Sequence, residues 1–405
     1  MHIVFNCIDI KPSYVGGINT FTLGLLDGFT ACGAGHNHLQ VSIAVTEKNK
    51  HLFTRFEPAC SLIVLTHKAG RLKAALRYFV LATTSQRLYY HYCRIAYAGL
   101  ARMLNKTADA VYIPTTVLFP YGLTIPTLVS MHDIQHVHFP HFFNVIQLIS
   151  RIITFSITTR HTTMFQASSQ FLKHDLLKNL PGIDDSKVTV IREGVTIGDF
   201  QKIDRAINVR EIYGLDESYL FFPAQLWPHK NHITVLKALL ILKKKYGLCI
   251  QMVMTGQIFS AGEEIFSFIK DNHLDTVRYL GKVPFSHLAA LYQNARAFIT
   301  AVLYESSSLP ILEAAGAGTA ILASDTPPNR EMSEVLSINL FPPEDEISLA
   351  AVLNNVWNDD SLRRKQIAAN KKAIEYYAWK NVAAEYIRLI ENMIQNEKSR
   401  STVRL

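Results

Sequence analysis

The feature that most constrains this chain is the alternation of short β-branched runs with longer segments of helical period. Strands and helices that alternate along a chain are typical of parallel sheets with helices on both faces. The alternation occurs twice, because the apolar periodicity fades between Gly194 and Glu217 and then resumes at a strong strand signal, residues 219–223. The pattern predicts an α/β protein with two doubly wound sheets.

A chain of 405 residues has room for two domains. We expect an N-terminal Rossmann-like domain over residues 1–200, a linker over 201–217 and a C-terminal Rossmann-like domain over 218–405. The tail from residue 345 to 393 is helical in pattern and passes two tryptophans. It should pack along the second domain or bridge back to the first.

The charge balance narrows the classes of ligand. Lysine and arginine total 41 against 33 aspartates and glutamates, which gives a formal net charge of +8. This surplus suits an anionic ligand such as a phosphate ester, or an anionic membrane surface. No sustained basic block is present, which disfavours nucleic acid as a partner.

Three features indicate a cytoplasmic protein. The five cysteines are odd in number, widely spread and without a C-x-x-C pair, which favours a reducing compartment. The start MHIVFNCIDI is typical of a strand and lacks the pattern of a signal peptide. The most apolar helical segment, residues 142–159, carries Arg151 near its centre, so we expect a soluble helix and no transmembrane span.

A glycine pair, Gly16 and Gly17, follows the first predicted strand and precedes a helix. This arrangement aims backbone N–H groups and the positive end of a helix at the carboxyl edge of the sheet, where a phosphate would fit. Any strand-to-helix turn favours glycine, so a purely structural role stays open. The G-x-G-x-x-G spacing of dinucleotide-binding proteins is missing, which disfavours a nicotinamide dehydrogenase.

The most informative motif carries two carboxylates, Glu305 and Glu313, on either side of a predicted helix start. Pro310 favours the first helical turn, so the helix should begin near Leu309 with Ser308 available as its cap. The N–H groups of Ser308 and Leu309 would then face an anion, and the carboxylates could accept hydrogen bonds from sugar hydroxyls. The alternative is ordinary complementarity between an acidic first turn and the helix dipole.

A second cluster, PAQLWPHKNH at residues 223–232, follows the first strand of the second domain. Lys230 supplies a point charge able to neutralise a departing phosphate, and Gln225 supplies an amide donor. A solvated lysine beside a helix N-terminus is the alternative, but a cation there opposes the helix dipole. We therefore favour a functional role for Lys230.

Four histidines, His132, His136, His138 and His141, fall in one short loop after the strand at residues 127–131. Neither H-E-x-x-H nor paired C-x-x-C spacing is present, so we expect no metal site. His132 at the strand tip is interpreted as a hydrogen-bonding or acid/base group that lines a cleft. A structural and a catalytic role stay equally open for the other three.

Taken in order, these motifs resemble the retaining GT-B glycosyltransferases of glycosyltransferase family 4. The resemblance is greatest to bacterial mannosyltransferase-like members that build surface polysaccharides such as lipopolysaccharide, and it covers essentially the whole chain. The matching pieces are YVGGI at 14–18, HDIQH at 132–136, ASSQ at 167–170, VIREGV at 190–195, FPAQLWPHKNH at 222–232, LGKV at 280–283 and E-x7-E at 305–313.

The resemblance implies roles along the phosphate and the sugar of a donor. It places Gly17 on the donor diphosphate and His132 beside the transferred sugar. It assigns Lys230 to the leaving diphosphate and Glu305 to hydrogen bonds with the donor sugar. It also implies two domains that face each other across a cleft, the first for the acceptor and the second for the donor.

The resemblance also implies contacts with the nucleoside, from Glu313 to the ribose and from the backbone of Val283 to the base. The chain departs from many relatives at two places. Gln225 stands where many of them have arginine, which leaves one fixed positive charge fewer on the diphosphate. Residues 306–308 read Ser-Ser-Ser where many relatives have Gly-Phe-Gly, so the phosphate loop can be held differently.

The resulting interpretation is a cytoplasmic, metal-independent, retaining hexosyltransferase without a cofactor. The expected donor is a nucleoside diphosphate sugar, with GDP-mannose favoured over a UDP-hexose, and the expected acceptor is a glycan carried on a lipid. The alternatives are a non-catalytic GT-B-like partner protein, a sugar-nucleotide epimerase on the same scaffold, or a glycan phosphorylase. Retention of His132, Lys230 and Glu305 argues against the non-catalytic partner.

One predicted helical region of the first domain concentrates positive charge beside apolar residues. Its members are Lys68, Arg71, Lys73, Arg77 and Arg87, with Leu72, Leu76, Phe79 and Val80. A solvated helix face over the core is the favoured interpretation. The alternative is a peripheral patch on the anionic inner leaflet of a membrane.

Overall fold

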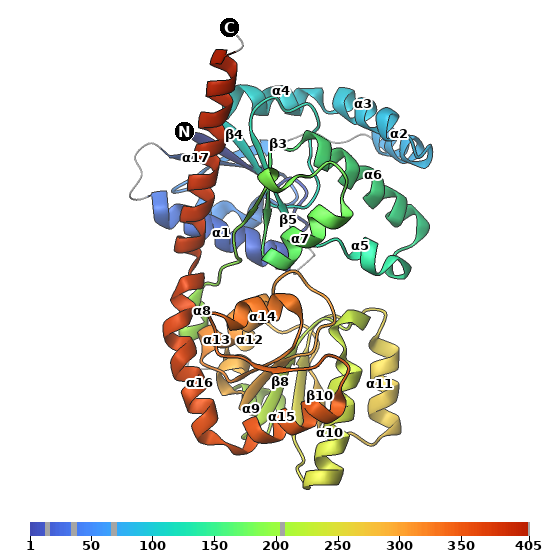
Figure 1. Cartoon of the computed structure of the whole chain (residues 1–405), viewed down its shortest axis with the longest axis vertical. Helices are drawn as coiled ribbons and strands as arrows, with labels where there is room; N and C mark the ends of the chain where they lie inside the picture. The colour runs from blue at the N-terminus through green and yellow to red at the C-terminus, as the bar shows by residue number, and fades with distance from the viewer. Residues whose placement is uncertain (13–16, 34–38, 66–70, 203–206, 404–405) are drawn as a thin grey trace. The chain divides into compact units, whose positions relative to one another are not determined.

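The computed structural model describes residues 1–12, 17–33, 39–65, 71–202 and 207–403. It divides into two compact units, the first comprising Met1–Glu193 with Trp379–Leu405 and the second comprising Gly194–Ala378. Each unit is built on one parallel sheet (Figure 1). The predicted α/β class and the two doubly wound sheets are confirmed.

The sheet of the first unit has seven parallel strands in the order β3-β2-β1-β4-β5-β6-β7, so the order reverses between β1 and β4. Its strands are β1 (His2–Asn6), β2 (Gln40–Thr46), β3 (Ser61–Leu65), β4 (Ala110–Ile113), β5 (Thr127–Met131), β6 (Met164–Ala167) and β7 (Val188–Val190). Its α-helices are α1 (Gly17–Gly33), α2 (Arg71–Ala82), α3 (Gln86–Ala96), α4 (Ala98–Thr107), α5 (Gln135–His138), α6 (Val145–His161), α7 (Gln170–Asn179) and α17 (Trp379–Val403).

Alternate residues of β1 enter different cores. Ile3 and Phe5 belong to one apolar cluster and Val4 to another, and all three are fully buried. Successive side chains of a strand point to opposite faces of the sheet. Both faces are therefore covered by helices, as the near-continuous apolar sequence of the strand predicts.

Local contacts and backbone angles set where the helices of two segments in the first unit begin and end. The apolar segment at 142–159 forms α6 from Val145, because Asn144 and Gln147 make reciprocal side-chain-to-backbone hydrogen bonds of 2.9 and 3.0 Å. Between residues 71 and 107 the chain forms three helices, because it breaks at Thr84, whose φ is +56°, and again at Tyr97. None of the helices in the described ranges has both the length and the apolarity to cross a membrane.

The last helix, α17, packs against α1 in the first unit, where Figure 1 shows the red helix beside the blue one. Gly24 and Gly28 of α1 make this contact close, because a Cβ at Gly24 would lie 2.1 Å from Nε1 of Trp379. A Cβ at Gly28 would lie 2.3 Å from the Trp379 carbonyl oxygen. Tyr386, further along α17, is fully buried in the same core.

The expected domain boundaries are corrected by this packing. The second domain predicted over residues 218–405 is wrong for residues 379–405, which complete the core of the first unit. The boundary lies between Glu193 and Gly194, not in the linker expected over 201–217. Phe200 and Val209 are buried in the core of the second unit, while residues 203–206 lie outside the described part.

The sheet of the second unit has six parallel strands in the order β10-β9-β8-β11-β12-β13, so it reverses between β8 and β11. Its strands are β8 (Tyr219–Pro223), β9 (Gln251–Thr255), β10 (Val277–Tyr279), β11 (Ala297–Thr300), β12 (Ile321–Ser324) and β13 (Asn339–Phe341). Its α-helices are α8 (Ile197–Gln201), α9 (Val209–Tyr213), α10 (His232–Tyr246), α11 (Gly262–Asp271), α12 (Phe285–Asn294), α13 (Leu309–Ala317), α14 (Pro327–Ser333), α15 (Glu346–Asn358) and α16 (Asp360–Ala373).

This sheet also separates two cores. Leu220 and Phe222 of β8 enter one cluster, and Tyr219 and Phe221 enter the other. The short edge strand β13 was not predicted, because three residues of Asn-Leu-Phe carry little period-2 signal.

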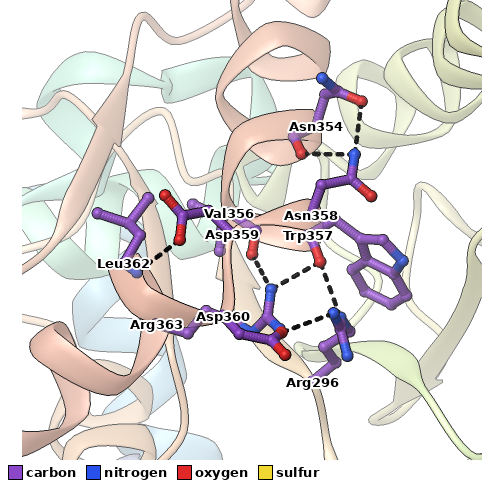
Figure 2. Close-up of polar contacts among 9 residues, drawn as sticks. All are labelled: Arg296, Asn354, Val356, Trp357, Asn358, Asp359, Asp360, Leu362 and Arg363. Atoms are coloured by element: carbon purple, nitrogen blue, oxygen red, sulfur yellow. Dashed lines mark hydrogen bonds and ion pairs between the residues drawn. The ribbon is translucent and has the colours of Figure 1, made fainter.

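The turn between α15 and α16 is fixed by two arginines (Figure 2). Nε of Arg296 donates to the carbonyl of Trp357 at 2.9 Å, and a second nitrogen of Arg296 lies 3.0 Å from the Asp360 carboxylate. Arg363 donates to the same Trp357 carbonyl at 2.6 Å and also pairs with Asp360. Carbonyls at the end of α15 thus gain the cationic donors that helix C-termini favour.

Candidate active site

The carboxyl ends of β8 and β11 lie side by side where the second sheet reverses its strand order. Open α/β sheets bind ligands at such a reversal. The loops that follow the two strands are joined by a hydrogen bond of 2.8 Å from the N–H of Leu303 to the carbonyl of His229. We call residues 224–231 and 301–308 together the β8–β11 edge.

Lys230 and Glu305 meet at the β8–β11 edge. Nζ of Lys230 lies 3.1 Å from Oε2 of Glu305, and the two side chains are 22% and 11% exposed. Oε1 of Glu305 is buried and accepts no hydrogen bond within the described part of the chain. The pair therefore combines a cation with a carboxylate oxygen that can still accept a hydroxyl.

Helix α13 begins at Leu309, as predicted, but Ser308 does not cap it with its side chain. Pro310 has no N–H, and the N–H of Ile311 bonds to the Ser308 carbonyl at 3.1 Å, so neither usual capping donor is available to the hydroxyl. Oγ of Ser308 is buried and has no partner among the described residues, at 1% residue exposure. A buried hydroxyl and the first N–H groups of a helix thus lie beside Glu305, an arrangement suited to an anion.

Glu313 lies in the second turn of α13 and is paired with a tyrosine. The hydroxyl of Tyr292, on α12, donates to Oε2 of Glu313 at 2.8 Å. Burial raises the pKa of Glu313 to about 7, and the tyrosine hydrogen bond opposes that shift. Glu313 can therefore change its protonation state near neutral pH.

Gln225 is held by a neighbouring aromatic pair. The indole of Trp227 donates from Nε1 to Oε1 of Gln225 at 3.1 Å, and it stacks on Phe259 with ring centroids 4.0 Å apart. Because the indole nitrogen is only a donor, it orients the glutamine amide with its oxygen toward Trp227. The hydrogen bond therefore fixes the amide oxygen of Gln225, the residue that stands where many relatives have arginine.

The loop after β9 adjoins both the loop after β8 and the loop after β10. Gly256 has φ +131° and donates its N–H to the Gly281 carbonyl at 2.9 Å. A Cβ at Gly256 would lie 2.4 Å from the carbonyl oxygen of Ala224, so only glycine allows the loops to approach this closely. Val283, two residues after Gly281, is half-buried against the core.

His229 and His232 flank Lys230 in the sequence and are both buried. Burial lowers the pKa of each to about 3, and the Lys230 charge contributes in the same direction. Both imidazoles are therefore neutral at physiological pH. His232 stacks on Phe222 with ring centroids 4.3 Å apart, which is a structural role.

In the first unit, His132 is held at the end of β5. Its Nε2 lies 2.6 Å from the Pro114 carbonyl, so Nε2 is the donor, and its ring meets the Phe21 ring edge-on at 5.1 Å. Nδ1 lies 4.0 Å from Oε1 of Glu193. Burial lowers the pKa of His132, so the neutral imidazole presents Nδ1 as an acceptor.

The remaining loop histidines divide by environment. His138 is bound by the Asp175 carboxylate at 2.8 Å. His136 packs against the Phe155 ring at 4.6 Å, and burial lowers its pKa to about 4. Across the described residues, no group of three or more His, Cys, Asp or Glu side chains is arranged to hold a metal ion.

The structure places the predicted site residues in two groups. Lys230, Glu305 and Ser308 lie in the β8–β11 edge, and helix α13 follows it directly, with Leu309 as its first residue and Glu313 in its second turn. Gln225 and Val283 lie in the loops after β8 and β10. Gly17, the first residue of α1, and His132 lie in the first unit, and Gly16 falls outside the described residues.

Two further residues at the site, Tyr292 and Trp227, have no assigned role in the sequence analysis. Tyr292 sits among apolar residues of a helix and is indistinguishable there from a core aromatic. Trp227 lies within the PAQLWPHKNH motif at residues 223–232. Its position two residues after Gln225 was the signal that could have indicated a contact between these two side chains.

Two doubly wound parallel sheets, with the motifs above at the carboxyl edges of their strands, define the GT-B fold. The chain is similar in structure to HepE from Anabaena, solved in complex with UDP and glucose, with a TM-score of 0.71 at 16% identity. The similarity covers 97% of this chain and all of that one (100%).

Part of the second unit also matches a known sequence family. Residues 207–373 match the family described as Glycosyl transferases group 1. The chain is 26% identical over 241 residues to the O-antigen chain mannosyltransferase RfbU of Salmonella typhimurium, covering 58% of this chain and 62% of that protein. It is 25% identical over 206 residues to a phosphatidyl-myo-inositol mannosyltransferase of Mycobacterium leprae, covering 50% and 54% of the two chains. The matches therefore span between half and two thirds of these relatives.

Proposed function

We propose that this protein is a glycosyltransferase that moves a hexose from a nucleoside diphosphate sugar to a glycan acceptor in surface polysaccharide synthesis. The observation that carries the proposal is the 3.1 Å contact of Lys230 with Glu305 beside the first turn of α13. A cation and helix N–H groups suit a diphosphate, and a carboxylate suits sugar hydroxyls. The group 1 glycosyltransferase match of residues 207–373 supports the same activity.

In this proposal, each candidate site residue of the second unit binds one part of the donor. Lys230 and the N–H groups of Ser308 and Leu309 neutralise the diphosphate, with the Gln225 amide as a further donor. Glu305 accepts a hydroxyl of the sugar. On the nucleoside, Glu313 binds the ribose and the backbone of Val283 contacts the base.

The first unit is proposed to serve the acceptor. His132, neutral and fixed by the Pro114 carbonyl, is assigned to the transferred sugar. The glycine turn that includes Gly17 is assigned to the donor diphosphate. Replacement of His132 by alanine should lower kcat, and unchanged turnover would remove this assignment.

The proposed reaction retains the configuration of the sugar and uses no metal or cofactor. The acceptor hydroxyl oxygen bonds to the anomeric carbon on the face from which the diphosphate leaves, and its proton passes to the departing phosphate oxygen. Lys230 and the α13 N-terminus stabilise the charge that develops on the leaving group. Activity measured in excess EDTA tests the independence of a metal, and full activity is expected. NMR assignment of the product anomer tests the retention of configuration.

Mannose from GDP-mannose is the proposed donor, ahead of a UDP-hexose. The names of the two relatives support mannose, whereas the HepE structure contains UDP. A thermal-shift screen with GDP, UDP, ADP and TDP separates the donors, because a ligand that binds only the folded state raises its stability by RT ln(1 + [L]/Kd). Stabilisation by UDP without GDP would overturn the choice of donor.

Incubation of the donor alone and then with acceptor separates the alternative activities. A transferase releases nucleoside diphosphate in proportion to glycan product, an epimerase converts the donor without acceptor, and a non-catalytic partner does neither. Transfer by the wild-type protein that is lost in Lys230→Ala would support the proposal. Epimerised donor in the absence of acceptor would replace it.

A lipid-linked acceptor and a peripheral membrane contact complete the proposal. The sequence has no aspartate or glutamate between Glu57 and Asp109, a stretch that holds α2, α3 and α4. Among the described side chains of α2, Leu76 and Phe79 are apolar and exposed, at 44% and 69% exposure. On α3 Leu88 and Ile95 share one face, because they are seven residues apart, at 56% and 76%.

Basic residues accompany these exposed apolar side chains. Arg87 and Arg94 are exposed on α3. Arg77 on α2 donates from Nε to the Tyr89 hydroxyl at 2.8 Å, so it also braces the two helices. Lys68 and the side chains of Arg71 and Lys73 lie outside the described part. An anionic leaflet attracts such residues by about 1 kcal/mol each at low salt.

Vesicles of stated composition test the membrane contact. The protein should bind phosphatidylglycerol vesicles more strongly than phosphatidylcholine vesicles, with binding that weakens as salt rises. Reversal of Arg71, Arg87 and Arg94 to glutamate should abolish the difference and lower transfer to a lipid-linked acceptor. Reversal of the exposed lysines 243–245 on α10 is the matched control. Equal binding to both vesicles would remove the membrane claim.

The cytoplasm is the proposed compartment. All five cysteines are free thiols, and four of them are buried, as a reducing environment allows.

A further inference from the structure

Tyr292 is a buried residue of α12 whose hydroxyl reaches the neighbouring helix α13. It has no exposed surface, and its hydroxyl donates to Oε2 of Glu313 at 2.8 Å. Glu313 itself is only half-buried. One carboxylate oxygen is therefore engaged from the core side, while the side chain retains access to a ligand.

The position of Tyr292 is fixed from several directions. Its ring meets the Phe221 ring edge-on, with centroids 4.9 Å apart, and lies 5.6 Å from the Phe298 ring. Its carbonyl accepts a hydrogen bond from the Thr319 hydroxyl at 2.6 Å. A side chain held this way presents its hydroxyl at one point and pays little further entropy when a ligand binds.

We propose that Tyr292 is a positioning residue for recognition of the nucleotide ribose. By donating to Oε2, it holds the Glu313 carboxylate in one orientation and favours its ionised form, so that the other oxygen accepts a ribose hydroxyl. The inference rests on the proposed function, in which Glu313 binds the ribose. It goes further by assigning selection of ribonucleotides over deoxyribonucleotides to a buried tyrosine that does not contact the ligand.

The electrostatic surroundings of Glu313 support this role. Burial raises the pKa of Glu313 to about 7 and the Tyr292 hydrogen bond lowers it, while burial also raises the pKa of Tyr292 well above its usual value, so the tyrosine remains a donor. The titratable and charged residues on the helices packed against α13 are His287 and Tyr292 on α12, Asp199 on α8, Asp360, Arg363, Arg364, Lys365, Lys371 and Lys372 on α16, and Glu375, Tyr376 and Tyr377 on the 3-10 helix Ile374–Tyr377. The adjoining strands β11 and β12 carry none.

Loss of the Tyr292 hydroxyl should therefore weaken nucleotide binding through Glu313. In Tyr292→Phe the ring and its packing stay, but the carboxylate loses the hydrogen bond that favours its ionised form. We expect the Kd for UDP or GDP, whichever binds the wild-type protein, to rise about ten-fold at pH 7, equivalent to about 1.4 kcal/mol. The preference for that nucleotide over its 2′-deoxy form should shrink toward unity.

The pH profile gives a readout that a purely structural role would not move. Wild-type affinity should increase with pH through about 7, because the ionised carboxylate accepts the ribose hydroxyl. The midpoint should move to higher pH in Tyr292→Phe. Glu313→Gln supplies the baseline, since it lacks this titration but keeps that of the nucleotide phosphate, whose second pKa is about 6.

Tyr219→Phe is the matched control. Tyr219 is fully buried in the same core, and its hydroxyl donates to the Leu291 carbonyl at 2.7 Å. The Tyr219→Phe variant should lose stability as Tyr292→Phe does. Its nucleotide affinity, the pH midpoint of that affinity and its preference for the ribonucleotide should stay at wild-type values. Circular dichroism of each variant reports whether its fold is intact.

The outcomes separate this inference from the proposed function. Wild-type binding of UDP or GDP with an unchanged Kd, midpoint and ribose preference in Tyr292→Phe overturns the role of Tyr292 alone. No binding of UDP, GDP, ADP or TDP by the wild-type protein overturns the donor site and this inference together. If Tyr292→Phe does not fold, Glu313→Gln decides, because a pH profile unchanged from wild type contradicts the proposed ionisation of Glu313.

Discussion

Nζ of Lys230 lies 3.1 Å from Oε2 of Glu305, a contact that joins the loops following two neighbouring strands, β8 and β11. Each side chain is mostly buried, so loss of either partner leaves the other with an uncompensated charge. The two residues should therefore behave as a unit.

Lys230→Ala should lower kcat by about 10²–10³, or roughly 2.7–4 kcal/mol, if the lysine stabilises leaving-group charge as an oxyanion donor does. Adding Glu305→Ala should cost less than the sum of the single losses, because the unit is already broken. Steady-state kinetics on the true donor measure both. Lys237→Ala, on the exposed side of α10, is the control and should have wild-type turnover. Full activity of Lys230→Ala would exclude its assigned role.

Ser308→Ala should separate stability from binding. The Ser308 hydroxyl is buried and has no partner in the described ranges, so its removal should leave the free energy of unfolding unchanged or higher. Donor affinity should fall about five-fold, measured by calorimetry, because we expect this hydroxyl to donate to the diphosphate alongside the N–H groups of Ser308 and Leu309. Ser324→Ala should do the reverse, since its hydroxyl donates to the Val302 carbonyl at 2.6 Å. A destabilised Ser308→Ala with normal affinity would speak for a structural hydroxyl.

Gly28→Ala should destabilise the first unit by about 1–3 kcal/mol through overpacking. The added methyl would meet the Trp379 carbonyl oxygen at 2.3 Å and Cβ of Ala383 at 2.9 Å. In Gly33→Ala, in the same helix, the added methyl would have no neighbour within 4 Å among the described residues, so the change should be neutral or stabilising. Urea denaturation compares the two, and equal effects would contradict the packing of α17 on α1.

Stability should fall as the pH drops from about 6.5 toward 3. Burial lowers the pKa of His229 and His232 from 6.5 to about 3, so between these values the unfolded chain binds more protons than the folded one. Glu313 acts in the opposite direction between 4.5 and about 7. His232→Phe removes one titration without touching Glu313 and should flatten the decline. His273→Asn, at an exposed position, is the control and should leave the decline in stability unchanged. If stability fell as steeply with pH in His232→Phe as in the wild-type protein, His232 would not be a source of the decline.

The strands of both sheets could be predicted from sequence because they are buried on both faces and rich in β-branched and apolar residues. Residues 127–131 and 219–223 are strands with the predicted bounds. The start of α13 was predictable for an equally local reason, the position of Pro310. Local chemistry specifies these elements whatever their tertiary surroundings.

The packing of α17 on α1 and the missing side-chain cap at Ser308 could not be predicted in this way. An amphipathic helix presents an apolar face without identifying what covers it, and the glycines of α1 that receive Trp379 are more than 300 residues away in the chain. Ser308 has the residue type of a cap, but the missing N–H of Pro310 and the hydrogen bond of Ile311 remove its targets. The roles of all the predicted site residues, Gln225 and Val283 among them, remain predictions.

The chain leaves the first unit after Glu193 and re-enters it at Trp379. The two connecting segments are joined close to these points, because the N–H of Val195 donates to the Tyr377 carbonyl at 2.8 Å. During translation the second unit is complete once residue 378 has left the ribosome. The first unit, although begun earlier, still lacks the helix that covers Phe21 and Leu25 of α1. Its apolar surface must therefore be shielded throughout synthesis of residues 194–378, which makes the nascent first unit the part of the chain on which chaperones should act.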